Sequence, residues 1–186
     1  MKFVQAPPEF FDLPDEVEED IYYSNQGQTG SCVRHALAKA VKRAINLLTH
    51  GSVNIPVNNL INMLLTNRAD LGEQGAEPEE WDGKKGCVHC TRNYIYQIQL
   101  HVERRTLDVE NADVICVDLH DALPKWKKDS WHALFSYETV GDLIHLKNSW
   151  GTSHTLIKLS RKWFRNNETN MYRVTLSALV TTAIHN

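Results

Sequence analysis

The chain has 186 residues, of which 42% are hydrophobic and 23% charged, and its formal net charge at pH 7 is -3. These figures predict one ordinary soluble domain with its own core, and they exclude low-complexity disorder and a disulfide-dense mini-protein. No apolar run approaches the roughly 20 residues that cross a bilayer, and the slight negative charge provides no general field for a nucleic acid.

Residues 1–20 predict an extended arm laid over the surface, because this segment is acidic and interrupted by proline. The segment has no apolar stretch of signal-peptide length. With only four cysteines in the chain, we expect a cytoplasmic protein with free thiols. A secreted or delivered protein trimmed from a longer precursor would have the same sequence features.

Two amphipathic helices are predicted in the first third of the chain. Between residues 32 and 48 apolar side chains recur at spacings of three and four, Ser31 stands at the cap position, and Gly51 follows the last turn. Four basic residues of this helix fall outside the apolar stripe: Arg34, Lys39, Lys42 and Arg43. A second helix is expected after Pro56, because proline suits the first helical position.

The rest of the chain is predicted to be mostly β-structure. Residues 67–91 are polar and rich in glycine, which predicts long loops, and residues 94–102 fit either a helix or a strand. Short apolar runs bounded by turn residues predict five strands: 114–119, 131–137, 143–147, 155–159 and 171–176. Helices followed by strands indicate an α+β domain with two segregated halves and a cleft between them.

Cys32 is a candidate nucleophile, because a loop punctuated by glycine, residues 26–31, leads directly into the first predicted helix. In the first helical turn, unpaired backbone N–H groups and the positive end of the helix dipole favour an anion, which predicts a lowered pKa for the thiol. The alternative is a small buried hydrophobic residue, the commoner fate of a lone free cysteine.

A nucleophilic thiol needs a base and a partner that orients the base. If Tyr137 pairs with Leu143 across a five-residue loop, His132 and Asn148 face each other across two antiparallel strands. At that separation an amide can hold an imidazole in one tautomer. A bulge or a different loop length would change this register.

These segments resemble the papain-like cysteine proteases, whose Cys-His-Asn arrangement follows the same order along the chain. The resemblance rests on Gln26-Gly27, Gly30-Ser31-Cys32, His132-Ala133 and Lys147-Asn148-Ser149-Trp150-Gly151-Thr152. It implies a single papain-like domain over residues 1–186, with an N-terminal helical lobe, a C-terminal antiparallel β lobe and the active site in the cleft between them.

The resemblance also implies a role for each matched residue. Cys32 would be the nucleophile, and His132 would be the general base and then the acid. Asn148 would orient His132, and Gln26 would donate its side-chain amide to the oxyanion beside the Cys32 N–H. Trp150 would shield the hydrogen bond between His132 and Asn148 from water.

Two residues are candidates for substrate binding on the same resemblance. Gly75 matches the family's glycine-rich substrate-binding strand, and Trp150 borders the site. The match includes no N-terminal inhibitory segment, so we expect control to come from location, a partner or redox state.

The sequence departs from the family pattern at three points. Val33 stands where an aromatic residue usually follows the nucleophile, and Thr29 replaces a cysteine that forms a disulfide in secreted members. The 100 positions from Cys32 to His132 fall short of the roughly 130 to 150 that are typical of the family. Shortened loops of this kind predict substrate pockets that differ from those of relatives.

The other reactive side chains do not predict a second site. Cys87 and Cys90 have the spacing of half a zinc site, which Cys116 or His101 would have to complete, but the sequence lacks a second close pair. We expect no metal and no other cofactor. His35 is close enough to the nucleophile to be an alternative base, but its apolar neighbours favour a buried structural residue with satisfied hydrogen bonds.

The favoured function is hydrolysis of a peptide or isopeptide bond through a thioester acyl-enzyme. The expected partners are protein or peptide substrates, including ubiquitin-like conjugates, rather than nucleic acids or membranes. Two alternatives stay open: a transamidase or ligase that passes the acyl group to an amine, and a catalytically silent binding module with a protease-like fold. Product analysis with and without an added amine separates hydrolysis from transfer.

Overall fold

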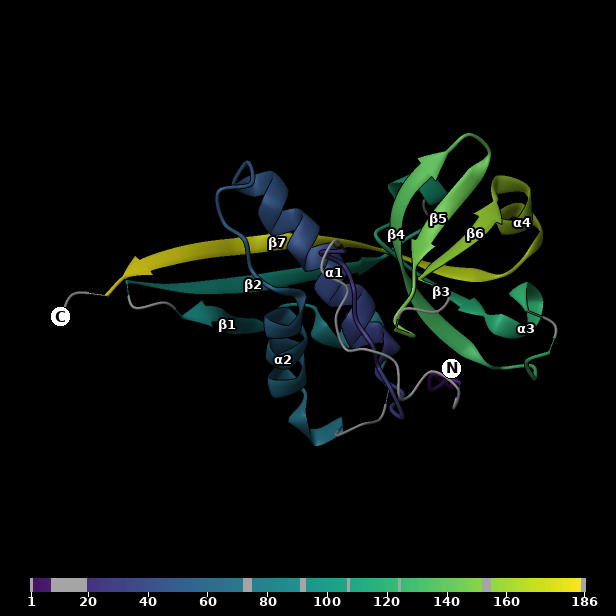
Figure 1. The fold of residues 1–186 in the computed structure, drawn as a ribbon, viewed down its shortest axis with the longest axis horizontal. Helices are drawn as coiled ribbons and strands as arrows, with labels where there is room; N and C mark the ends of the chain where they lie inside the picture. Colours follow the sequence, from purple (N-terminus) through teal and green to yellow (C-terminus); the bar gives the residue numbers. More distant parts are fainter. Residues whose placement is uncertain are drawn as a thin grey trace.

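Figure 1 shows a computed structural model of the chain, which describes residues 2–7, 20–71, 75–90, 93–106, 108–123, 125–151 and 155–184. Within these residues the fold is α+β, with N-terminal helices packed on an open antiparallel sheet of seven strands. The elements in chain order are α1 (Cys32–Leu48), α2 (Val57–Asn67), β1 (Lys85–Cys90), β2 (Tyr94–Arg104), β3 (Val114–Asp118), α3 (Leu119–Ala122), β4 (Trp131–Val140), β5 (Leu143–Lys147), β6 (Leu156–Ser160), α4 (Arg161–Asn166) and β7 (Thr169–Ala183). None of the described helices combines the length and the apolar content that a membrane span needs.

The strands of the sheet follow the order β1-β2-β7-β3-β4-β5-β6, and each neighbouring pair is antiparallel. β2 and β7 form a long ribbon that reaches away from the other strands, with β1 along its edge (Figure 1). Helix α1 contacts β4 and β7, and α2 contacts β1. At the other end, α3 packs on β3 and α4 on β6. The two long helices therefore cover one part of the sheet, and the short helices accompany the other.

Two clusters of buried apolar side chains divide the interior. The first lies between α1, α2 and the ribbon, and it includes Leu37 and Trp81. The second lies among β3, β4 and β5, and it includes Leu134 and Trp150. Cys32 belongs to the first cluster and Trp150 to the second. The residues of the predicted site therefore lie where the two clusters meet.

Helix α1 has the bounds that the sequence predicts. Gly51 adopts a φ of 78°, and its N–H donates to Asn46 O at 2.9 Å, which closes the end of the helix. Ser31 occupies the cap position, but its side chain bonds to Thr29 instead of capping the helix. The prediction of a polar side is wrong for the first part of α1, where Lys39 is buried with its neighbours because β4, β7 and α2 surround the helix.

The antiparallel strands confirm the predicted β half and extend it. Residues 94–102, which fitted a helix or a strand, belong to β2, and β7 is longer than the run that predicted it. The loop prediction for residues 67–91 is wrong over residues 85–90, which form β1. This edge strand has no alternating apolar pattern in the sequence, and its hydrogen bonds to β2 hold it in place.

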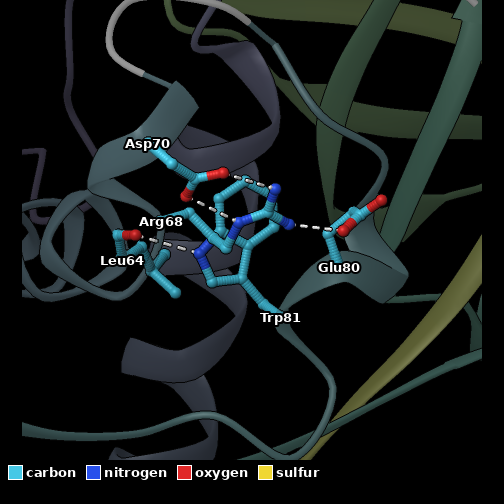
Figure 2. A network of polar contacts seen from close by, with 5 residues as sticks. All are labelled: Leu64, Arg68, Asp70, Glu80 and Trp81. Carbon is cyan, nitrogen blue, oxygen red and sulfur yellow. Dashed lines mark hydrogen bonds and ion pairs between the residues drawn. The ribbon is translucent and has the colours of Figure 1, made fainter.

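A polar network holds the segment between α2 and β1 (Figure 2). Trp81 is buried, and its indole N–H donates to Leu64 O at 2.9 Å. Arg68 forms ion pairs with Asp70 at 3.0 Å and with Glu80. These contacts join residues on both sides of Gly75, the predicted substrate-binding glycine, to the end of α2.

The predicted N-terminal arm is described in part, since residues 8–19 lie outside the described residues. Residues 2–7 are extended, and Phe3 forms a parallel bridge with Trp131 at the start of β4. Ala6 is buried in the second apolar cluster. This part of the arm is therefore packed into the domain and does not simply lie over its surface.

Candidate active site

Segments far apart in the sequence meet at the start of α1. The loop before α1 is joined to the chain after β5 by a bridge between Asn25 and Trp150. The start of β4 lies beside them, since the N–H of Ala133 donates to the thiol of Cys32 at 3.4 Å. Together the segments gather four predicted residues: Gln26, Cys32, His132 and Asn148.

His132 and Asn148 form the pair that the sequence predicts. Nε2 of His132 lies 2.6 Å from Oδ1 of Asn148, and the N–H of Ser149 donates to the same oxygen at 2.8 Å. An amide oxygen only accepts hydrogen bonds, so the proton of the neutral imidazole is on Nε2 and the lone pair is on Nδ1. In this tautomer, Nδ1 can accept a proton from a thiol.

The predicted register of the hairpin is wrong, although the pair forms. A two-residue turn joins β4 to β5 instead of a five-residue loop, and a bulge interrupts the ladder between Ser136 and Glu138. Ser136 lies opposite Leu146, two positions away from the predicted register. Because a shift of two positions keeps each side chain on the same face, His132 and Asn148 still meet, although both lie beyond the last pair of β4 and β5, Phe135 with Lys147.

Trp150 lies against the imidazole. Its ring stacks on His132 with the centroids 4.7 Å apart, and it also stacks on Trp126 at 5.7 Å. Trp150 is 2% exposed. This position suits the predicted shielding of the hydrogen bond between His132 and Asn148. Contact between Trp150 and a substrate would require the residues that bury the Trp150 ring to move.

Burial shifts the pKa of the Cys32 thiol in the direction opposite to the one that the sequence predicts. The side chain is 0% exposed, and loss of solvent raises the pKa of the thiol to about 12. The N–H groups of Ala133 and of the helix start lower this pKa, but by less. The prediction of a lowered thiol pKa is therefore wrong for this conformation, because it considered the helix start and not the desolvation.

The candidate base is neutral for the same reason. Burial lowers the pKa of His132 to about 4, and the hydrogen bond to Asn148 opposes this by less. Among the described residues, Nδ1 of His132 has no hydrogen-bond partner, so the imidazole and the thiol of Cys32 are not bonded to each other. At neutral pH the site therefore holds a thiol and a neutral imidazole on adjoining segments instead of an ion pair.

Gln26 is buried beside this pair, and its amide is fully engaged. Nε2 donates to Val4 O at 2.8 Å and to Thr29 O at 2.9 Å, while Oε1 accepts from Oγ of Ser149 at 2.6 Å. Thr29 and Ser149 belong to the segments that build the site, so they hold the amide in place. The bond to Val4 is the one that a substrate oxyanion would have to replace.

The N-terminal segment, residues 2–7, runs along the site in an extended conformation. The N–H of Val4 donates to Trp131 O at 3.0 Å, and the N–H of Ala6 donates to Gly27 O at 3.2 Å. The segment thus binds main-chain groups of both the nucleophile loop and the start of β4. The sequence predicts an arm here but gives no sign that the arm contacts the site.

Gly75 packs closely on the loop that carries the nucleophile. A Cβ atom at this position would lie 2.7 Å from Gly30 O and 2.8 Å from Cβ of Phe3. A larger residue would force these segments apart, so glycine is the side chain that fits. Gly75 therefore lies beside the candidate site, and its contact with a substrate stays a prediction.

The two alternative sites from the sequence differ in outcome. His35 is buried as predicted, and burial holds its pKa well below the ordinary value, but its Nδ1 has no hydrogen-bond partner among the described residues. The expectation of a satisfied side chain is therefore wrong at this atom. The half zinc site falls in β1, where the side chain of Cys90 lies outside the described residues. In the part of the chain that is described, no three His, Cys, Asp or Glu side chains are grouped to hold a metal ion.

The predicted cleft is closed at the nucleophile, since Cys32 and His132 are both 0% exposed. A hollow of about 600 Å³ lies between the end of β2 and the start of β7. Arg104 and Asn170 help to line it, but none of the predicted site residues does. In this conformation the thiol of Cys32 is therefore not accessible to a molecule in solution.

Sequence reasoning missed one buried charge beside the site. Lys39 is 1% exposed, and its Nζ donates to the main-chain oxygen of Asn148 at 3.1 Å. The signal that could have found it is its position seven residues after Cys32, which places both side chains on the same side of α1.

Comparison of the chain with known protein families, with curated proteins and with solved structures gives no match. The site is therefore interpreted from its own contacts and from the motifs in the sequence.

Proposed function

We propose that the chain is a thiol hydrolase with a papain-like two-lobed domain, which cleaves peptide or isopeptide bonds through a thioester on Cys32. The observation that carries the proposal is the hydrogen bond of 2.6 Å between Nε2 of His132 and Oδ1 of Asn148. It directs Nδ1 away from the amide. The thiol of Cys32 lies close by, because it accepts a hydrogen bond from the N–H of Ala133, the residue after His132. The two apolar clusters would be the cores of the two lobes.

In the proposed reaction, the thiol proton of Cys32 passes to Nδ1 of His132 as the sulfur attacks the carbonyl carbon of the substrate. The oxyanion that forms accepts from the N–H of Cys32 and from Nε2 of Gln26, once the bond to Val4 is released. Nδ1 then gives its proton to the leaving amine as the C–N bond breaks. Water attacks the thioester with His132 as the base, and the acid product leaves as the thiol is restored.

An extended peptide is the substrate class that the surroundings favour. Residues 2–7 bind the main chain of Trp131 and Gly27, and Val4 presents its carbonyl oxygen to Gln26. A substrate that displaced this segment would find the same main-chain partners. An isopeptide at the end of a ubiquitin-like tail offers the same carbonyl chemistry.

A catalytically silent binding module is the second candidate, and one observation favours it. Cys32 and His132 are fully buried, and burial raises the pKa of the thiol and lowers that of the imidazole. A closed resting state of an enzyme has the same features. Reactivity of the thiol separates the two.

Labelling of the full chain with a peptide vinyl sulfone, followed by mass spectrometry, tests the proposal. Cys116 is the matched control, since it is also fully buried and burial also raises the pKa of its thiol. We expect Cys32 to be labelled faster than Cys116, and Cys32→Ala to lose hydrolysis of a peptide library and of ubiquitin-like conjugates. Equal labelling of the two thiols without hydrolysis would overturn the hydrolase and favour the silent module. Products joined to an added amine would instead indicate a transamidase.

A further inference from the structure

A lysine ammonium group lies in the interior, directly behind the candidate site. Lys39 is almost fully buried, and its Nζ donates to the main-chain oxygen of Asn148 at 3.1 Å. Lysine is rarely buried, because taking its charge out of water is costly. The presence of a lysine here therefore needs a reason, because an apolar side chain could fill the same space without that cost.

The hydrogen bond joins the helix that carries Cys32 to the residue that holds His132. Asn148 is fixed at three points: its N–H donates to Thr155 O at 2.9 Å, its Oδ1 accepts from Ser149, and its main-chain oxygen accepts from Lys39. The first two bonds lie within the chain around β5 and β6. The third comes from α1, so Lys39 sets the distance between the helix and the orienting amide.

Several charged or titratable groups surround the ammonium group. From the loop before α1, Asp20 stabilises the charge of Lys39, while Lys147 on β5 opposes it and itself binds Asp20 at 3.0 Å. From α1 and β4, the groups that respond to Lys39 are Cys32, His35 and His132. A positive charge here favours the thiolate of Cys32 but disfavours a proton on His132, so its two effects on proton transfer from sulfur to nitrogen oppose each other. The contact that bears on the reaction is therefore the hydrogen bond from Lys39 to Asn148.

We propose that Lys39 is a positioning residue, which fixes Asn148 against the nucleophile helix and so holds the imidazole of His132 where it can accept the thiol proton. This inference rests on the proposed function, because it assigns a reaction to the pair that Lys39 holds. Lys39 itself touches no substrate atom in this scheme.

Lys39→Met tests the proposal, with Lys42→Met as the matched control. Methionine keeps much of the length of lysine and removes the charge. Lys42 lies on the same helix and is also buried, but its Nζ donates to Ile55 O and to Oδ1 of Asn54, away from the site. The readouts are the titration of the His132 ring, followed by nuclear magnetic resonance of carbon-13-labelled histidine, and the separate values of kcat and KM.

In Lys39→Met we expect the pKa of His132 to rise and kcat to fall about tenfold, with KM changed little. Lys39→Arg keeps the charge and should restore the wild-type titration. Lys42→Met should lower the thermal midpoint and leave both the titration and kcat unchanged. An unchanged titration with unchanged kcat in Lys39→Met would overturn the proposal, and so would an equal effect of Lys42→Met.

A measurement on the wild-type chain covers the case in which Lys39→Met does not fold. Burial lowers the pKa of Lys39 to about 7, so its proton loss should move the carbonyl carbon resonance of Asn148 across neutral pH. A resonance of Asn148 that stays constant while the Cε resonance of Lys39 itself titrates would overturn the proposal.

The titrations need no substrate, so the two proposals can fail separately. A wild-type chain that turns over no substrate, with a shifted His132 titration in Lys39→Met, would remove the hydrolase and support the coupling to Lys39. An active wild-type chain, with neither a shifted titration nor a lower kcat in that variant, would support the hydrolase and overturn the role of Lys39.

Discussion

Nε2 of Gln26 donates to the carbonyl oxygen of Val4 at 2.8 Å, so the amide expected to bind a substrate oxyanion instead binds the chain's own N-terminal segment. The same segment packs Phe3 against the apolar cluster below α1 and Ala6 into the cluster among the β-strands. It therefore crosses the site from one cluster to the other. The sequence leads us to expect control by location, a partner or redox state, and these contacts add the expectation that a substrate of the proposed hydrolase would compete with this segment.

Val4→Pro should make Cys32 more reactive. Proline lacks the N–H that Val4 donates to Trp131, so the segment loses a main-chain bond close to Gln26. We expect a vinyl sulfone to label Cys32 several-fold faster in this variant than in the wild-type chain, measured by mass spectrometry. Gln5→Ala is the control, because Gln5 is exposed, and it should behave as the wild type does. Unchanged labelling in Val4→Pro would mean that the segment does not limit access to the thiol.

Cys32→Ala and Cys116→Ala should have similar effects on stability and different effects on activity. Both thiols are fully buried, so each substitution removes a small side chain from the interior and should lower the free energy of unfolding by about 1 kcal/mol. Only Cys32→Ala should abolish turnover. Urea denaturation and a peptide hydrolysis assay check the two expectations. Retained hydrolysis in Cys32→Ala would remove this residue from the mechanism.

Local signals in the sequence were sufficient for α1 and for the antiparallel strands. The spacing of apolar residues between Ser31 and Gly51 depends only on neighbouring residues, and it gives the helix with its bounds. The meeting of His132 and Asn148 was also predictable, since an error of two positions in the register leaves both side chains on the same face. The length of the turn between β4 and β5 could not be predicted, because the alternation of apolar and polar residues along a strand does not reveal a bulge.

Burial by distant segments is what the sequence could not supply. Lys39 falls outside the apolar stripe of its helix, yet strands that come a hundred or so residues later cover it. The predicted direction of the pKa shift of Cys32 is wrong for the same reason, because desolvation depends on every segment that packs on the thiol. The edge strand β1 depends on its pairing with β2 and not on its own apolar pattern.

His132→Ala and Asn148→Ala should differ in severity. His132→Ala removes the group that accepts and returns the proton, so kcat should fall by several orders of magnitude. Asn148→Ala removes only the acceptor that holds Nε2, and we expect a smaller loss of kcat with a KM close to that of the wild type. Steady-state kinetics on one peptide substrate compares them. A mild effect of His132→Ala would point to another base, and full activity in Asn148→Ala would remove the orienting role.

The stability of the chain should fall as the pH is lowered from about 6.5 to about 4, in part through His132. Its pKa is about 4 in the folded chain and near 6.5 when exposed, so the unfolded chain binds more protons between these values. A shift of this size corresponds to at most about 3 kcal/mol of unfolding free energy, present above this range and lost below it. Urea denaturation across the range measures the slope. His132→Gln should reduce it, while the part due to His35, whose pKa is shifted in the same direction, should persist. An equal slope in His132→Gln would mean that the imidazole is solvated in the folded chain, and the closed site would then be the wrong description of the resting state.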